Sequence, residues 1–348
     1  MKITAQHLIS LMNEWAPPSL AEKWDHPGLQ VGNSQVPVQK VLISLDLTEE
    51  NVDRAIRDGV SMIISHHPFL FKGLHELDLS TYKGRVIEKL IKHDILAFAA
   101  HTNLDTAEGG VNDALAAALD LKEIRGLVPE KTYPMYKLAA YVTPTAAKAF
   151  YYHVKEAYGE DVGHYYLLDD EDDMTEEAKM EMNVLAPSLP SLLADLKTYC
   201  GKVHYDIYPL ENGEEREYMG RVGSLPTEMS GIEALQYIKE KLGIPDLRYA
   251  GDVERKVKTI AVLGGAGSEF AELAKAKGAD LYLTGDLKYH EAQDAARLGL
   301  LIADGGHFYT ERVIVPTLAK RIREVAKEKG WELEVVEDSD AKDIFGHV

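Results

Sequence analysis

The sequence predicts an α/β fold, and two observations support that prediction. Apolar runs with strand character alternate with helical patterns near both ends of the 348-residue chain. Between these two regions the alternation gives way to a different pattern. We therefore expect a two-part βα sheet core, residues 1–130 and 216–348, interrupted by a small α+β insert at residues 131–215.

The first part opens with a helical pattern at residues 4–15, which ends before Pro17. Three apolar runs then predict buried strands at residues 41–47, 59–65 and 95–100. Helical patterns follow these strands at residues 49–58, 81–93 and 109–120. Strands that alternate with helices in this way are typical of a parallel sheet with helices on both faces.

The last part repeats the alternation. Its predicted strands are residues 257–263, 279–284 and 300–304, and its predicted helices are residues 268–277, 287–297 and 309–327. We expect the two parts to form two halves of one sheet. The insert has strand candidates at residues 137–142, 182–187 and 203–210. Its acidic run at residues 169–173 is expected to be a solvated loop or the start of a helix.

Charge and composition exclude several classes of protein. The formal net charge of −19 repels phosphate backbones, so nonspecific binding to nucleic acid is disfavoured. The one cysteine, Cys200, cannot form an internal disulfide, and we expect it to be a buried apolar residue. No run reaches the roughly 18 apolar residues that span a bilayer, and the N-terminus does not read as a signal peptide. The sequence therefore predicts a cytoplasmic protein with no membrane segment.

Polar clusters follow three of the predicted strands. His66 and His67 follow the second strand, Asp105 follows the third, and His307 follows the last, with Glu311 one helical turn later. Ligands of open parallel sheets bind outside the carboxyl ends of the strands, so these clusters are expected to meet in one crevice. Imidazole and carboxylate together bind transition metals such as Zn, Fe and Mn. Five such ligands fit a pair of cations better than one, and Asp105 could bridge the pair.

Structural roles for the same residues remain open at this point. A His-His pair can be incidental, and Asp105 could cap the helix that follows it. The run Gly264-Gly265-Ala266-Gly267 could approach a phosphate or simply form a tight strand-to-helix turn. Asp286 could cap a helix, while His290 could donate a proton or lie exposed.

Six segments together resemble the GTP cyclohydrolase 1 type 2 homologue family, also described as NGG-interacting-factor-three-like proteins. They are WDHPGLQVG (24–32), SHHP (65–68), HTNLD (101–105), GGAGS (264–268), TGDLKYH (284–290) and DGGHFYTE (304–311). The resemblance covers both outer thirds of the chain in the right order. It implies a dinuclear metal centre held by His66, His67, Asp105, His307 and Glu311.

The resemblance also implies a toroidal homohexamer and a PII-like insert. Residues 131–215 match the place of that insert, and YDIYPLEN (205–212) is similar to its end. Two departures stand out. His26 replaces the Asn that often follows the Trp-Asp pair, and the insert is short and acidic between Glu160 and Asn183, which puts its usual ligand site in doubt.

The function we expect is that of a dinuclear-metal-dependent hydrolase acting on a nucleotide-like substrate. Two divalent metal ions would activate water, and His101 or His290 would transfer protons. The family name suggests opening of the guanine ring of GTP. Two alternatives stay open: a metal-dependent phosphoesterase, and a metallochaperone or regulatory toroid that binds metal without catalysis. A ring around nucleic acid is disfavoured by the acidic charge.

Overall fold

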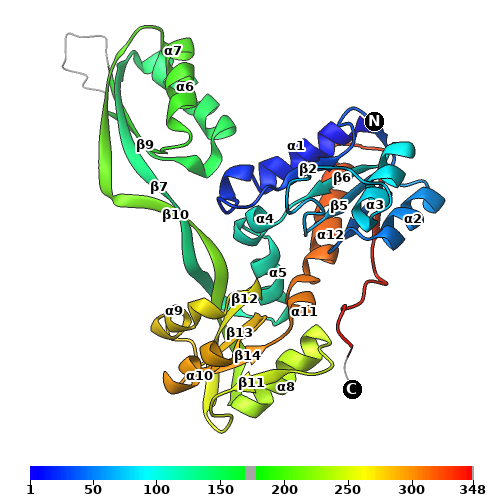
Figure 1. Ribbon diagram of the computed structural model, residues 1–348. Coiled ribbons are helices and arrows are strands. Elements are labelled where there is room, and N and C mark those ends of the chain that lie inside the picture. Colours follow the sequence, from blue (N-terminus) through cyan, green and yellow to red (C-terminus); the bar gives the residue numbers. More distant parts are fainter. Residues whose placement is uncertain (169–177, 347–348) are drawn as a thin grey trace. The chain divides into compact units, whose positions relative to one another are not determined.

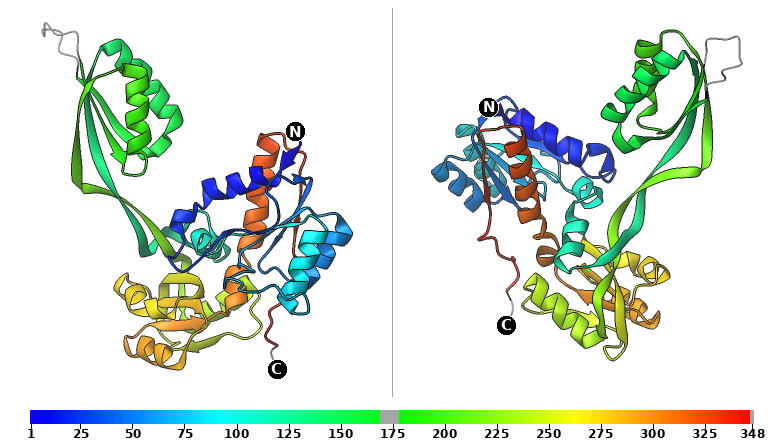
Figure 2. Two further views of the ribbon diagram at one scale, coloured as in Figure 1. Left: turned by 45° about the horizontal axis from the view of Figure 1, so that its top comes forward. Right: turned by 180° about the vertical axis from the view of Figure 1, so that it is seen from behind.

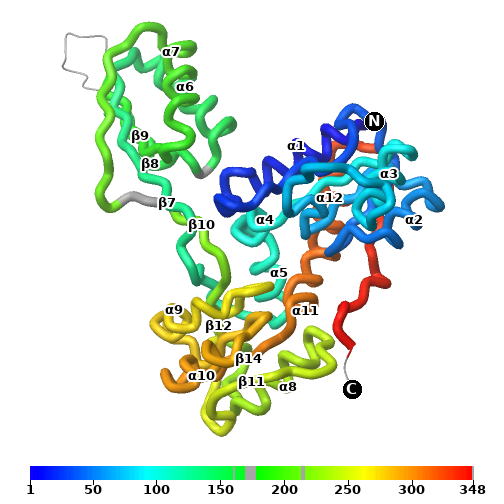
Figure 3. Tube along the Cα trace, viewed as in Figure 1, coloured from blue at the N-terminus to red at the C-terminus, as the bar shows by residue number. Residues whose placement is uncertain are grey.

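The computed structural model of the protein describes residues 1–168 and 178–346, so the acidic run at residues 169–173 lies outside the described residues. The chain divides into two compact units. The first comprises Met1–Glu130 and Glu217–Val348, and the second comprises Lys131–Arg216 (Figure 1). The tube in Figure 3 follows the chain from the first unit through the second, shown in green, and back into the first.

A five-stranded sheet forms one half of the first unit. Its strands in order are β15 (Glu334–Glu337), β4 (Lys40–Ser44), β5 (Met62–Ser65), β6 (Leu96–Ala99) and β2 (Gly28–Val31). The first four run parallel, and β2 pairs antiparallel with β6 at the edge. A small separate ladder joins β1 (Ile3–Thr4) to β3 (Pro37–Val38).

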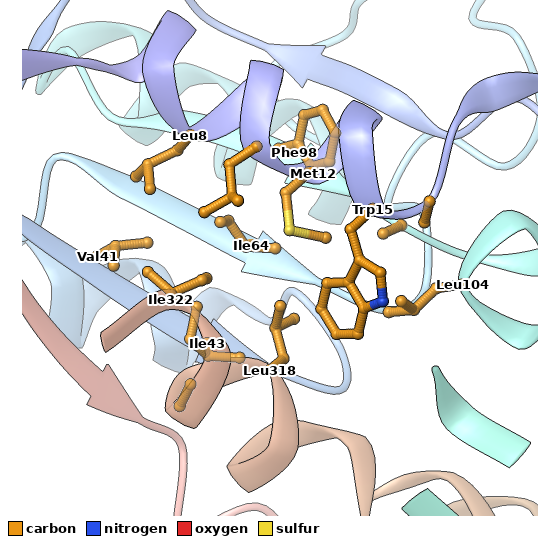
Figure 4. Close-up of a cluster of buried hydrophobic side chains, with 14 of the residues drawn as sticks. Leu8, Met12, Trp15, Val41, Ile43, Ile64, Phe98, Leu104, Leu318 and Ile322 are labelled. Atoms are coloured by element: carbon orange, nitrogen blue, oxygen red, sulfur yellow. The ribbon is translucent and has the colours of Figure 1, made fainter. Parts of the chain in front are cut away.

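Helices cover both faces of this sheet. Helices α1 (Ala5–Trp15) and α12 (Ile314–Glu328) lie on one face, and α2 (Glu49–Asp58) and α3 (Tyr82–Lys92) lie on the other (Figures 1 and 2). Successive strand residues alternate between the two layers, as the two-residue period of a strand requires. Ile43 and Ile64 pack against the first pair of helices (Figure 4), whereas Leu42 packs against the second pair.

A second sheet forms the other half of the first unit. Its strands in order are β11 (Arg248–Ala250), β14 (Leu301–Asp304), β13 (Leu281–Gly285), β12 (Lys256–Ala266) and the end of β10 (His204–Ser230). The three central strands are parallel, while β11 and β10 are antiparallel to their neighbours. Helices α5 (Val111–Ala118) and α8 (Gly231–Leu242) cover one face, and α9 (Ala271–Ala276) and α10 (Tyr289–Arg297) cover the other.

The predicted α/β class is confirmed, but the prediction of a single sheet is wrong. Most of the last third of the chain forms the second sheet. Only α12 and β15 from that third pack against or pair with the first sheet. The parallel run of each sheet is ended by an antiparallel strand, β2 beside β6 in the first sheet and β10 beside β12 in the second.

Most expected helices and strands of the first unit occur close to their predicted bounds, but β7 (Lys122–Val142) and β10 are much longer than the strands predicted at residues 137–142 and 203–210. The strands β2, β8 (Val162–Leu168), β11 and β15 and the helices α4 (Thr102–Thr106) and α8 were not predicted.

The second unit has a ferredoxin-like order of elements. They are β7 (Lys122–Val142), α6 (Pro144–Ala157), β8 (Val162–Leu168), β9 (Ala178–Leu185), α7 (Leu189–Cys200) and the beginning of β10. The strand order is β10-β7-β9-β8, and the inward residues of β7 and β9 pack against both helices. Cys200 is half-buried at the end of α7, where burial raises the pKa of its thiol. Among the described residues, no helix combines the length and apolar character needed to cross a bilayer.

Candidate metal centre

The structure brings His66, His67, Asp105, His307 and Glu311 together inside the first unit. The two adjacent histidines follow β5 directly. Asp105 lies in the short helix α4 (Thr102–Thr106), which follows β6, and the other two residues begin and end the short helix α11 (His307–Glu311), which follows β14. The carboxyl ends of strands from both sheets therefore converge on one cluster, as the rule for open parallel sheets predicts.

Glu311 is the centre of this cluster. One carboxylate oxygen, Oε2, lies 2.8 Å from His67 Nε2 and 3.1 Å from His307 Nε2. The other oxygen, Oε1, lies 3.8 Å from His66 Nε2. A single buried carboxylate thus faces three imidazoles, two contributed by the first sheet and one by the second.

Asp105 completes the cluster on the side of His66. Its Oδ1 atom lies 3.6 Å from His66 Nε2, which is too far for a hydrogen bond. Both atoms are buried, and neither has a hydrogen-bond partner among the described residues. Two buried, unpartnered acceptors that face each other are costly unless a cation lies between them, so this arrangement fits a metal ion.

Each of the three imidazoles is held by a hydrogen bond at Nδ1, the ring nitrogen that points away from the cluster. The Nδ1 atoms of His66, His67 and His307 each lie 2.8 Å from an oxygen outside the cluster, respectively Ala100 O, Asp46 Oδ1 and Asp286 Oδ2. Because Nδ1 donates to these oxygens, Nε2 of each ring points into the cluster, where it offers a lone pair to a cation once its proton has left. Metal-binding histidines in proteins are oriented in the same way.

Sequence reasoning missed the roles of Asp46 and Asp286. The helix-cap role predicted for Asp286 is wrong, because α10 begins after Lys288 and has no side-chain cap. Both aspartates stand within two residues of the end of a parallel strand, β4 or β13, and that position is the signal that could have identified them. The capping role considered for Asp105 does not occur either, since Gly110 precedes α5.

His101 extends the cluster on the side of the first sheet. Its ring centroid lies 5.4 Å from that of His66 and 5.8 Å from that of His67. Its Nδ1 atom lies 3.1 Å from Oδ1 of the buried Asp25, a second residue that sequence reasoning missed. Thr102 donates to Asp25 from both its backbone amide and its hydroxyl. These contacts outweigh the effect of burial and lower the pKa of Asp25 to about 2, so the carboxylate beside His101 is charged.

The remaining predicted residues lie elsewhere. His290 is exposed at the start of α10, where its ring contacts Tyr289, and it belongs to none of the candidate metal groups among the described residues. His26 is also exposed, and its backbone amide donates to Asp25. The structure therefore gathers the five predicted ligands and His101, but brings neither His290 nor His26 to them.

The glycines at the end of β12 make room for Glu311. Gly265 has a φ of +68°, and a Cβ built on it would lie 2.2 Å from Glu311 Oε1. Its amide donates to Thr310 Oγ1 at 3.1 Å, which ties α11 to the end of β12. Gly265 is thus required by the close approach of a carboxylate, a reason that neither the phosphate-binding nor the tight-turn interpretation of this motif contained.

Protons balance the buried charge when no cation is bound. Burial lowers the pKa of His67, but hydrogen bonds to Asp46 and Glu311 outweigh it and raise that pKa to about 10. The hydrogen bond to Glu311 raises the pKa of His307 to about 9. Burial raises the pKa of Asp105 to about 7. Burial would also raise the pKa of Glu311, but the surrounding imidazoles hold it well below its usual range.

The described side chains form three groups that could hold a metal ion. They are His67 with His307 and Glu311, His66 with Asp105 and Glu311, and His66 with His67 and His101. Within each group the candidate ligand atoms lie within 4.8 Å of one another. Three protein ligands that leave one position open are typical of a catalytic metal. A cavity of about 1490 Å³ opens at His67 and His307 and gives access to the cluster.

Comparisons with known proteins agree with the resemblance in the sequence. The sequence profile of the Duf34/NIF3 family (NGG1p interacting factor 3) matches residues 3–343. The chain is 37% identical to the GTP cyclohydrolase 1 type 2 homolog of Bacillus subtilis, over 94% of each protein. It is 35% identical to the protein of the same name from Halalkalibacterium halodurans, over 99% of each. The crystal structure of a Bacillus cereus protein related to NIF3 has a TM-score of 0.89 at 35% identity and covers 99% of both chains.

The raised imidazole pKa values predict how the stability of chelator-treated protein depends on pH. The folded-state pKa values of His67 and His307, about 10 and 9, exceed the ordinary value of 6.5 that applies to the unfolded chain. The stability that these groups contribute is therefore complete below about pH 6.5 and is lost as pH rises toward 10. Chemical denaturation at several pH values should show the free energy of unfolding falling over this range.

A His67→Gln and His307→Gln double variant is the control for that measurement. It should show a smaller fall than the parent protein, because it lacks the two titrating imidazoles. A parent protein whose stability is constant or rises from pH 7 to pH 10 would contradict this account of the buried charge.

A second prediction concerns the room that Gly265 provides. In Gly265→Ala the new methyl group displaces Glu311, so metal affinity should fall by about 10- to 100-fold, the usual cost of disturbing the support of a ligand. Gly59→Ala is the matched control, because Gly59 has a similar φ of +70° with nothing within 4 Å of its Cβ position. Elemental analysis after dialysis measures the retained metal. Equal retention in the two variants would show that Gly265 does not serve Glu311.

Proposed function

The chain belongs to the Duf34/NIF3 family, and from the geometry of its imidazole–carboxylate cluster we propose that it is a hydrolase that works with two divalent cations. The observation that carries the proposal is the sharing of Glu311 between two groups of candidate ligands. One group adds His67 and His307 to it, and the other adds His66 and Asp105. A carboxylate shared in this way is typical of paired metal sites.

The ligand chemistry restricts the cations to a few types. Neutral imidazole and carboxylate together suit Zn, Fe and Mn, whereas a site for Ca or Mg would be built mainly from oxygen. The bridging role expected for Asp105 passes to Glu311 in this proposal, because Glu311 alone faces all three imidazole Nε2 atoms. When bound, such cations supply Lewis acidity and lower the pKa of water at the site.

The residues of the chain would orient the reactants and move protons. Asp46 and Asp286 fix the directions of His67 and His307, so the ligand positions are set before any substrate arrives. His101 would exchange a proton with the substrate or with water at Nε2, while the charged Asp25 carboxylate lies 3.1 Å from Nδ1 and stabilises the protonated ring. The cavity beside His67 and His307 gives a substrate access to that side of the cluster.

A nucleotide-like substrate is the class that we propose. The curated relatives carry the name GTP cyclohydrolase 1 type 2 homolog, which points to hydrolytic opening of the guanine ring. The acidic charge of the whole chain does not oppose an anionic substrate at this site, because two divalent cations would dominate the local field.

Metal analysis of two variants tests the shared role of Glu311. Asp105→Asn should keep about one equivalent of metal per chain, because only one ligand group contains Asp105. Glu311→Gln should lose both equivalents, since both groups contain it. His290→Gln, which alters an exposed imidazole outside the cluster, should keep both. Full metal content in Glu311→Gln would overturn the proposed pair of sites.

Turnover of metal-loaded protein tests the proposed reaction. We expect GTP to be hydrolysed at its guanine ring, with activity abolished by a chelator and in Glu311→Gln. Hydrolysis of phosphoesters in place of the ring would identify a phosphoesterase. Tight metal binding with no metal-dependent turnover on GTP or on a phosphoester panel would contradict a hydrolase and favour a metal-binding or regulatory protein.

A further inference from the structure

Two exposed aromatic rings lie side by side next to the cluster. Trp24 stands in the loop before β2, and Phe71 stands in the loop between His67 and α3. Their ring centroids are 5.7 Å apart, and the ring planes are inclined by 63°. The side chains remain 54% and 48% exposed.

Both rings contact the imidazole that borders the candidate metal ligands. The centroid of His101 lies 6.0 Å from that of Trp24 and 6.2 Å from that of Phe71. The same imidazole also contacts the rings of His66 and His67. A small molecule bound to the aromatic pair would therefore be separated from the candidate metal-binding side chains by the width of one imidazole ring.

The aromatic pair does not belong to the core. Neither ring is a member of the hydrophobic clusters formed by the described residues, whereas Trp15 is buried and donates its indole N–H to Glu108 O. The mutual contacts are edge-to-face, so each contact covers one face of only one of its two rings. Uncovered ring faces are the surfaces on which nucleobases stack.

The loop that carries Trp24 is held in place. Asp25 accepts hydrogen bonds from His26 and Thr102, and Glu22 donates its amide to Thr102 Oγ1. The indole is therefore presented on a fixed backbone, so that little conformational entropy is lost when a ligand binds.

The two lysines that adjoin the aromatic residues in the sequence favour a nucleotide over an apolar molecule as the ligand of the pair. Lys23 and Lys72 are the sequence neighbours of the two aromatic residues. Both are exposed, and neither has a carboxylate partner among the described residues. In a chain with a net charge of −19, an exposed lysine without a carboxylate partner, next in sequence to each ring, suits a planar base that carries an anionic group.

We propose that Trp24 and Phe71 form an aromatic wall on which the planar base of a nucleotide stacks beside the metal centre. The inference deepens the proposed function and rests on it for the reaction that follows binding. The wall selects the substrate by its base, and the reaction takes place at the candidate metal ligands on the other side of His101.

Calorimetric binding of GMP and of ribose 5-phosphate to the metal-loaded protein tests the wall without requiring turnover. GMP should bind at least about 10-fold more tightly than ribose 5-phosphate, which lacks the base. Trp24→Leu and Phe71→Leu should each lower the affinity for GMP by about 5- to 100-fold, the range that stacking on one aromatic ring supplies. Their affinity for ribose 5-phosphate should change little.

Two further variants make the result specific. Trp24→Phe retains a ring and should restore most of the affinity for GMP. Tyr289→Leu removes another exposed aromatic ring, one outside the cluster, and should bind GMP like the parent protein. Metal content should be unchanged in all four variants, because none alters a candidate ligand.

The outcomes separate the wall from the reaction. Loss of GMP affinity in Trp24→Leu together with absence of turnover in the parent protein would uphold the wall and reject the hydrolase. Equal GMP affinity in Trp24→Leu and the parent protein would overturn the wall. A lower oligomeric mass of Trp24→Leu in light scattering would also overturn it, because the ring would then be covered by a second copy of the chain.

Discussion

The buried carboxylate of Glu311 is the constraint on which both sheets of the first unit depend. It faces His66 and His67 from the ends of the first sheet and His307 from the second. A carboxylate that is only 4% exposed requires compensating positive charge, which protons on the imidazoles or bound cations can supply. The two sheets therefore meet at an electrostatic centre as well as at an apolar interface.

Several local features follow from that centre. The left-handed backbone at Gly265 leaves space for the carboxylate, and the short helix α11 sets His307 and Glu311 one turn apart on the same face. Asp46 and Asp286 aim their imidazoles inward through Nδ1. Each of these features lies at or just after the end of a parallel strand, where the backbone is positioned by the sheet and side chains from different strands can converge.

Much of the fold and of the cluster could be predicted because the relevant signals are local. Apolar runs such as residues 41–47 and 59–65 are short and strongly apolar, and they correspond to β4 and β5. The edge strand β2 was missed because its four residues include an exposed leucine and begin with a glycine at φ +114°. Helix α8 could have been found, since Ser230 and Glu233 form a capping box at its start.

Features that depend on distant parts of the chain were harder to predict. The division into two sheets follows from the pairing of β15 with β4, and no local pattern shows which strands will be neighbours. The aspartates that orient His67, His101 and His307 were missed as a group because each contacts an imidazole more than 20 residues away. The place of Asp46 and Asp286 just after a strand marks them as candidates in the sequence, but which imidazole each one orients becomes visible only in three dimensions.

Anomalous diffraction from crystals of the isolated protein tests the central claim most directly. The account predicts two peaks, one within about 2.0–2.3 Å of His67 Nε2, His307 Nε2 and Glu311, and the other equally close to His66 Nε2, Asp105 and Glu311. A single peak, or peaks that do not involve Glu311, would contradict the shared carboxylate on which the proposed function rests.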